Sequence, residues 1–284
     1  MNQKRILYED QDIIVCHKAA GIATQTARVG QADMVSEVRN YLSRSGGGGM
    51  PYVGVVHRLD QPVEGILVFA KNKKAAAGLS RQITEEQTEK YYYAVVCGHS
   101  FARQGDLEDY LWKDGRTNTS SVAPPEIKDA KRAFLHYEII AQREPEAFTG
   151  MEGYGTHQGN EDTGGEPERV ETVVGGCKLA LARIRLYTGR HHQIRVQMSN
   201  AGMSLLGDYK YADEEAVAIS KQMHVKEAAL CAYRLSFLHP GTGRRMEFRI
   251  RPEGKCFRIA EFWETFDRLD GTEEVNIESG GSVV

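Results

Sequence analysis

Residues 53–70 read VGVVHRLDQPVEGILVFA and predict two strands joined by a polar turn. Residues 53–57 form a short, mostly apolar segment. Residues 65–70 have no polar side chain, which is typical of a strand buried on both faces. A proline and a glycine mark the turn between them. Asp60 therefore lies at a strand end, where a rigid scaffold can present a reactive carboxylate. An aspartate that only turns or caps the chain is the alternative.

Strand-like segments recur on both sides of this stretch and outnumber the helices. No regular alternation of strand and helix is present, so we expect an α+β domain with a mixed, largely antiparallel sheet and flanking helices. The expected strands are residues 6–8, 13–17, 91–97, 132–140, 179–187, 228–238 and 244–250. The expected helices are residues 35–42, 73–83 and 192–200.

The remaining segments predict one domain with two acidic additions. Residues 143–178 are rich in Gly, Glu and Thr, and we expect a mobile insertion there. Residues 269–284 have the composition of a solvated acidic tail, which leaves 1–268 as the domain. Residues 112–130 are polar and contain proline, and they predict a loop or a small excursion from the domain. The glycines at 46–49 also predict a loop, because neither GK[ST] nor GxGxxG accompanies them.

The charge of the chain is unevenly distributed. The whole sequence has a net charge of −3, whereas residues 143–178 carry −5 and residues 270–284 carry −4. The rest therefore carries +6, which is compatible with a polyanionic partner but does not establish one.

Composition favours a soluble cytoplasmic protein. No apolar run approaches the roughly 18 residues of a membrane helix, and the opening MNQKRILYEDQD lacks the pattern of a signal peptide. The five cysteines are scattered without a CxxC pair, so we expect neither a zinc knuckle nor a disulfide framework.

A second polar cluster, LYTGRHHQIRV, occupies residues 186–196. A helix start with arginines beside it is a natural anion site. The adjacent His191 and His192 would point about 100° apart on a helix, which is a poor arrangement for one metal ion. His57 with Asp60 is another possible ligand pair, but nothing completes a set of three, so we expect no metal.

A third cluster, TEKYYYAVVCG, occupies residues 88–98. Side chains alternate along a strand, so Tyr92 faces opposite to Tyr91 and Tyr93. Tyrosine is ordinary in strands, but a tyrosine facing a cleft is also a stacking platform for an unstacked base.

The three clusters, in this order, resemble the RluA-type family of RNA pseudouridine synthases over residues 5–263, apart from the 143–178 insertion. HRLD is similar to the family signature and aligns Asp60 with its catalytic aspartate. KYYYAVVCG places Tyr92 at the family's active-site tyrosine, and residues 186–211 look like its TGRxHQIR…GD..Y pattern. The opening ILYEDQDIIVCHKAAG resembles the family's entry strands, with KAAG where KPAG is usual.

Two departures stand out. The chain has Val63-Glu64-Gly65 where Thr-Ser-Gly is common, and Gln197 where His is usual. We also expect the chain to lack the accessory RNA-binding domain that many relatives carry before the catalytic part.

The resemblance implies an isomerase that converts a uridine of rRNA or tRNA to pseudouridine without a cofactor. It implies a catalytic triad of Asp60, Tyr92 and Arg190, in which Arg190 holds Asp60 ionised by a bidentate contact. Tyr92 would stack on a base flipped out of its helix. Whether Asp60 acts as nucleophile or as base stays open.

Four basic residues are expected to contact the RNA. Arg58 would fill the space left by the flipped base or grip a phosphate; the expected backbone contacts are Lys71, Lys90 and Arg195. We expect a monomer. The competing hypotheses are a catalytically silent RNA-binding protein on the same scaffold and a metal-dependent hydrolase that uses His57, Asp60 and a histidine of the second cluster.

Overall fold

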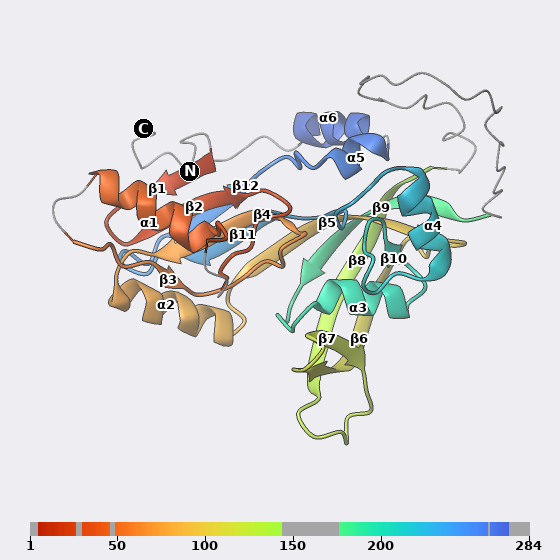
Figure 1. Cartoon of the computed structure of the whole chain (residues 1–284), viewed down its shortest axis with the longest axis horizontal. Helices are drawn as coiled ribbons and strands as arrows, with labels where there is room; N and C mark the ends of the chain where they lie inside the picture. The colour runs from red at the N-terminus through yellow and green to blue at the C-terminus, as the bar shows by residue number, and fades with distance from the viewer. Residues whose placement is uncertain (1–4, 27–29, 46–48, 144–175, 261, 273–284) are drawn as a thin grey trace.

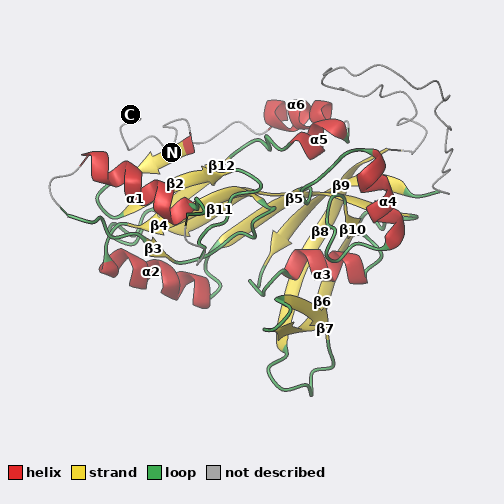
Figure 2. Cartoon of the chain, in the orientation of Figure 1, coloured by secondary structure: helices red, strands yellow, loops and turns green. Residues whose placement is uncertain are grey.

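The computed structural model describes residues 5–26, 30–45, 49–143, 176–260 and 262–272. Twelve strands form one sheet that runs across the described part of the molecule (Figure 2). The strands are β1 (Ile6–Glu9), β2 (Ile13–Lys18), β3 (Gly54–Val55), β4 (Glu64–Ala70), β5 (Glu89–Gly98), β6 (Gln104–Asp114), β7 (Thr119–Val122), β8 (Lys131–Arg143), β9 (Lys178–Leu186), β10 (Ser204–Leu205), β11 (Leu230–Leu238) and β12 (Arg245–Arg249). The helices are α1 (Met34–Ser45), α2 (Lys73–Thr84), α3 (Gln193–Asn200), α4 (Glu214–Gln222), α5 (Lys255–Ile259) and α6 (Trp263–Thr272).

The sheet is mixed and largely antiparallel, as the sequence predicts. Its order is β1-β2-β4-β11-β5-β9-β8-β6-β7, with β3 beside β4, β12 beside β11 and β10 beside β5. Among the described strands, only β4 and β11 pair in parallel. They approach closely because Gly65 faces Ala232: a Cβ on Gly65 would lie 2.5 Å from the Ala232 Cβ.

Helices α1 and α3 cover one face of the sheet. Apolar residues of α1, such as Met34 and Val38, share a buried cluster with alternate residues of β2 and β4. Ile194 of α3 joins the same cluster, as does Tyr92 of β5. Leu59, next to Asp60, is also part of it, so this face carries the residues around Asp60.

The opposite face is covered by the other helices. Leu79 of α2 packs with the intervening residues of β2 and β4. Aromatic side chains of α5 and α6, Phe257 and Phe266, pack with Tyr93 of β5. Tyr92 and Tyr93 therefore lie on opposite faces, which confirms the predicted alternation.

Strands β6 and β7 form a hairpin that projects from the main body with α3 near its base (Figure 1). Residues 112–130 were predicted as a loop or a small excursion; the loop was wrong for the residues that extend β6 and form β7, which are strands of this hairpin. Most side chains of the hairpin are at least partly exposed, Trp112 and Val122 among them. Alternate residues of β6 are covered, but Gly105 and Asp109 stand among them beside Leu107 and Leu111, so the apolar alternation is too weak to give a strand signal.

Most of the predicted insertion and tail, residues 144–175 and 273–284, lies outside the described residues. Helix α6 continues to Thr272, so it crosses the boundary expected at residue 269. Among the described helices, none is both long enough and apolar enough to span a membrane.

Candidate active site

Asp60 lies in the connection between β3 and β4, and the backbone on both sides of it is anchored. Thr24 Oγ1 donates to the Leu59 carbonyl (2.8 Å) and accepts from the Leu59 N–H (3.1 Å). On the other side, the buried Lys18 Nζ donates to the Gln61 carbonyl (3.1 Å). The Asp60 side chain is 28% exposed. The carboxylate is thus presented from a fixed backbone to a partly open space.

The charge partner of Asp60 is Arg195, whose Nη1 donates to Asp60 Oδ2 at 3.2 Å. The same guanidinium donates to both oxygens of Asp208, at 2.7 and 2.6 Å. Burial alone would lower the pKa of Arg195, but the contacts with Asp208 and the charge of Asp60 outweigh burial and raise it. Arg195 is therefore a buried, permanent cation beside Asp60, which differs from the RNA-backbone contact expected from the sequence.

Arg190 does not pair with Asp60, which corrects the predicted contact. Its Nε donates to the Arg132 carbonyl (2.7 Å), and its backbone N–H donates to Gln193 Oε1 (2.9 Å). Arg190 precedes α3, whereas Arg195 lies inside it, and this difference decides which guanidinium reaches Asp60.

Tyr92 is 7% exposed and lies on the Asp60 face of the sheet. Burial raises the pKa of Tyr92, and the negative charge of Asp60 raises it further. The phenol therefore keeps its proton at neutral pH and offers an uncharged ring close to the carboxylate.

His57, the first residue of the HRLD stretch, has a structural contact. Its Nε2 accepts a hydrogen bond from the Val68 N–H (3.1 Å), so the ring is neutral with the proton on Nδ1. Burial, together with the smaller effect of the charge of Lys90, lowers the pKa of His57 to about 3. His57 supports β4 and is not combined with Asp60 as a ligand pair.

The two histidines of the second cluster, His191 and His192, lie close to the Asp60 carboxylate. His192 Nε2 is 3.6 Å from Asp60 Oδ2, and His192 Nδ1 is 2.6 Å from the Tyr211 hydroxyl. His191 stacks on His192, with ring centroids 3.6 Å apart. The Tyr211 ring also faces the Arg195 guanidinium, 5.0 Å from its centroid.

Asp208 and Tyr211 were not assigned to the site from the sequence, and His192 was considered only as a ligand in the metal-dependent alternative. The only signal was their membership of the quoted 186–211 pattern.

The other basic residues predicted to contact RNA differ in how freely their charged groups can reach it. Arg58 is exposed, and no ion pair of its guanidinium is found among the described residues. Lys71 is bound to Glu9 at 2.6 Å. Burial lowers the pKa of Lys90, as does the charge of Arg190, while Glu86 raises it. Of these, Arg58 next to Asp60 is the most accessible.

Gln197, at one of the departures from the family pattern, is completely buried. Its Nε2 donates to Asp109 Oδ2 (2.7 Å), and its Oε1 accepts from Gln193 Nε2 (2.9 Å). Since Asp109 belongs to β6, Gln197 fastens α3 to the base of the hairpin.

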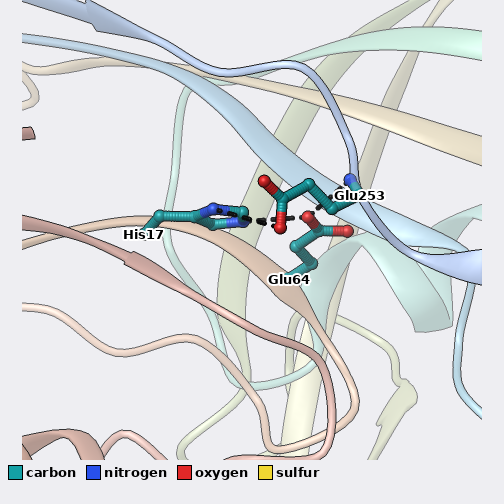
Figure 3. Close-up of side chains that lie close together, drawn as sticks. All are labelled: His17, Glu64 and Glu253. Atoms are coloured by element: carbon teal, nitrogen blue, oxygen red, sulfur yellow. Dashed lines mark hydrogen bonds and ion pairs between the residues drawn. The ribbon is translucent and has the colours of Figure 1, made fainter. Parts of the chain in front are cut away.

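Glu64, at the other departure, belongs to a group that has the spacing of metal ligands (Figure 3). Its Oε1 accepts from His17 Nε2 (2.8 Å) and from the Glu253 N–H (2.7 Å), while Oε2 accepts from the Gly254 N–H (2.8 Å). These hydrogen bonds occupy both carboxylate oxygens. Glu64 therefore joins β2 and β4 to the segment before α5.

The sequence matches proteins that modify RNA. A family model described as RNA pseudouridylate synthase matches residues 12–200. The ribosomal large subunit pseudouridine synthase D of Zymomonas mobilis is 30% identical over 249 residues, which cover 86% of this chain and 67% of that protein. The dual-specificity RNA pseudouridine synthase RluA of Vibrio parahaemolyticus is 30% identical over 236 residues, covering 83% and 78%.

A solved structure shares the fold. Human RNA pseudouridylate synthase domain containing 4 superposes with a TM-score of 0.61 at 19% identity, covering 90% of this chain and 91% of that chain. The sequence matches place the protein among isomerases that act on RNA. The chain belongs to the RluA-type family of RNA pseudouridine synthases.

Proposed function

We propose that this chain converts a specific uridine of ribosomal or transfer RNA to pseudouridine, with Asp60 as the catalytic carboxylate. The observation that carries the proposal is the contact of Asp60 with the buried cation of Arg195, close to Tyr92. A carboxylate in a partly closed site needs such a partner, because unpaired burial costs several kcal/mol. We assign that role to Arg195 in place of Arg190.

The reaction breaks the bond between ribose and uracil N1, turns the base and joins ribose to uracil C5. It is an isomerisation and needs no external energy source. Both close contacts of the Asp60 carboxylate, from Arg195 and His192, go to Oδ2. Among the described residues Oδ1 accepts no hydrogen bond, so we propose Oδ1 as the oxygen that reacts, whether as nucleophile or as base.

Tyr92 and Arg58 have complementary roles in this proposal. Tyr92 presents a neutral ring on which the flipped uracil can stack. Arg58, two residues before Asp60 and exposed, is placed to occupy the space that the base leaves or to hold a phosphate. Lys71 and Lys90 remain weaker candidates, because neighbouring acidic groups hold Lys71 and burial limits Lys90.

The test uses ribosomal and transfer RNA transcripts with tritium at uridine C5. Joining C5 to the ribose displaces this hydrogen, so tritium release counts product. We expect release by the wild type and none by Asp60→Ala, and mapping of pseudouridines in cells with and without the gene identifies the uridine. Equal release by both proteins would remove Asp60 from the mechanism.

The alternative is a catalytically silent RNA-binding protein on the same scaffold. It predicts RNA binding without pseudouridine in any cellular RNA. The pairing of Arg195 with both Asp60 and Asp208 favours the enzyme, because RNA binding alone gives no reason to hold a cation against a partly buried carboxylate. We also propose that the protein works as a cytoplasmic monomer, which light scattering in solution and localisation of a tagged copy would test.

A further inference from the structure

The loop at residues 208–211 connects the projecting hairpin with the surroundings of Asp60. On the hairpin side, Lys210 Nζ donates to the Asn118 carbonyl (2.6 Å). The Ser120 N–H of β7 donates to the Tyr211 hydroxyl (2.9 Å). The loop is thus fastened to the hairpin at two neighbouring points.

On the site side, the Tyr211 hydroxyl contacts His192 Nδ1 at 2.6 Å. The hydroxyl oxygen already accepts from Ser120, and the described residues offer its proton no other hydrogen bond. Every polar group is satisfied if Tyr211 donates to His192 Nδ1. His192 then carries its own proton on Nε2, which is the nitrogen directed at Asp60.

The distance from His192 Nε2 to Asp60 Oδ2 is 3.6 Å, slightly longer than a hydrogen bond. Such contacts in a site without substrate are commonly long and shorten when substrate binds. The chain of contacts from Ser120 through Tyr211 and His192 therefore ends at the reacting carboxylate.

The backbone of His192 supports a role beyond packing. Its φ is 53°, in the left-handed region, although it precedes α3 without capping the helix through its side chain. This conformation is unfavourable for most residues with a side chain, and such strain is concentrated at functional sites. The ring is also stacked on His191, which contacts Ser120 Oγ through Nδ1 (2.9 Å).

We propose that His192 is a positioning residue that orients Asp60, and that Tyr211, which is held by Ser120 of the β6–β7 hairpin, fixes the tautomer of His192. The inference rests on the proposed function, because it gives His192 a role only if Asp60 reacts.

The charges around His192 are compatible with a neutral, donating ring. The groups that act on it are Asp60, Arg195, His191 and Lys210. The pKa of His192 is lowered to about 4: burial is the largest cause, Asp60 opposes it, and Arg195, His191 and Lys210 act in the same direction as burial. The ring therefore stays neutral near pH 7, where its tautomer decides what it offers to Asp60.

Two substitutions of His192 distinguish a role in positioning Asp60 from a purely structural role. In His192→Gln the amide N–H can reach the place of Nε2 and still donate to Asp60, whereas the shorter side chain of His192→Asn replaces only Nδ1. Asparagine tolerates the left-handed backbone better than glutamine. A merely structural role therefore predicts that Asn is at least as active as Gln.

The positioning role predicts the reverse order. We expect His192→Gln to lower kcat by about threefold or less and His192→Asn by about tenfold or more, with KM for the RNA unchanged in both. Tyr211→Phe keeps the ring over Arg195 and removes the hydroxyl, and we expect it to lower kcat by about three- to tenfold. Thermal unfolding of each variant controls for loss of fold.

Nitrogen NMR of histidine-labelled protein gives a readout independent of activity. We expect His192, identified by the signal missing in His192→Gln, as the Nε2–H tautomer in the wild type and as a mixture in Tyr211→Phe. An Nδ1–H tautomer in the wild type, or Asn at least as active as Gln, would overturn the inference. If Asp60→Asn retains full activity, the proposed function fails instead, so the two failures are distinguishable.

Discussion

Arg195 and Asp208 form a bidentate ion pair, with 2.7 Å from Nε to Oδ2 and 2.6 Å from Nη2 to Oδ1. The side chains are 7% and 1% exposed. Two parallel contacts fix the plane of the guanidinium, so the remaining nitrogen, Nη1, is directed at Asp60. Asp208 thus decides where the positive charge of the site lies.

Replacing Asp208 by asparagine is expected to reduce both activity and stability. The buried arginine would lose its charge partner, and breaking such a pair costs about 3–5 kcal/mol of the free energy of unfolding. We expect kcat to fall by about 100-fold, because Nη1 is no longer aimed at Asp60. Urea unfolding and tritium release measure the two effects.

The matched control is Asp106→Asn, which removes a more exposed carboxylate paired with His136. It should change the free energy of unfolding by less than about 1 kcal/mol. Asp208→Asn with wild-type stability and activity would show that the pair does not organise the site.

Replacing either arginine of the second cluster by lysine distinguishes the role of Arg195 from that of Arg190. Arg195→Lys keeps a positive charge but loses the fork that reaches Asp208 and Asp60 together, so we expect kcat to fall by about 100-fold or more. Arg190→Lys loses one contact to a backbone carbonyl, and we expect less than about a tenfold effect. Single-turnover rates at saturating RNA measure both effects. A larger loss of rate in Arg190→Lys than in Arg195→Lys would indicate that Arg190 is the charge partner of Asp60.

Gly65 is expected to accept no side chain. Its φ is 144°, and a Cβ would lie 2.6 Å from the Ala232 backbone nitrogen. We expect Gly65→Ala to lower the free energy of unfolding by more than about 3 kcal/mol, because β4 and β11 must separate. Gly115→Ala is the control, since nothing lies within 4 Å of its Cβ position. Equal unfolding midpoints for the two variants would contradict the packing described.

The lowered pKa of His57 predicts that the folded protein loses stability in acid. Its pKa is 6.5 when unfolded and about 3 in the fold, so between these values the unfolded chain binds more protons. The free energy of unfolding therefore decreases as the pH falls from 6.5, by up to about 1.4 kcal/mol per pH unit from this residue.

The control variant is His57→Gln, which keeps an acceptor for the Val68 N–H and cannot titrate. We expect its stability, measured by urea unfolding from pH 7 to 4, to fall less steeply than that of the wild type. Parallel curves would mean that His57 binds its proton over the same pH range in the folded and the unfolded protein, which contradicts the lowered pKa. His192, whose pKa is lowered to about 4, contributes with the same sign in both proteins.

Local sequence patterns predict the body of the sheet well. Buried strands such as β4 and β5 contain continuous apolar runs, at 65–70 and 91–97, and the alternation of Tyr92 and Tyr93 follows from strand geometry. The β6–β7 hairpin was missed because its stability comes from pairing with β8, a contact distant in sequence. Its covered positions include Gly105 and Asp109, so the face that packs on the body leaves only a weak apolar pattern.

The site was predicted only in part for a similar reason. Asp60 and Tyr92 stand in distinctive motifs, but Arg190 and Arg195 lie five residues apart in one basic segment. Which arginine meets Asp60 depends on the left-handed turn at His192 and on the start of α3 at Gln193. It also depends on Asp208, whose role appears only when the loop after β10 is placed beside α3.

The most direct test of the central claim is the single-turnover rate of tritium release by Asp60→Asn, at saturating RNA, beside the wild type. Asparagine keeps the size of the side chain and removes its charge, so we expect unchanged folding and RNA affinity with a rate lower by about 1,000-fold or more. A rate within tenfold of the wild type, from correctly folded protein, would contradict the assignment of Asp60 as the catalytic carboxylate.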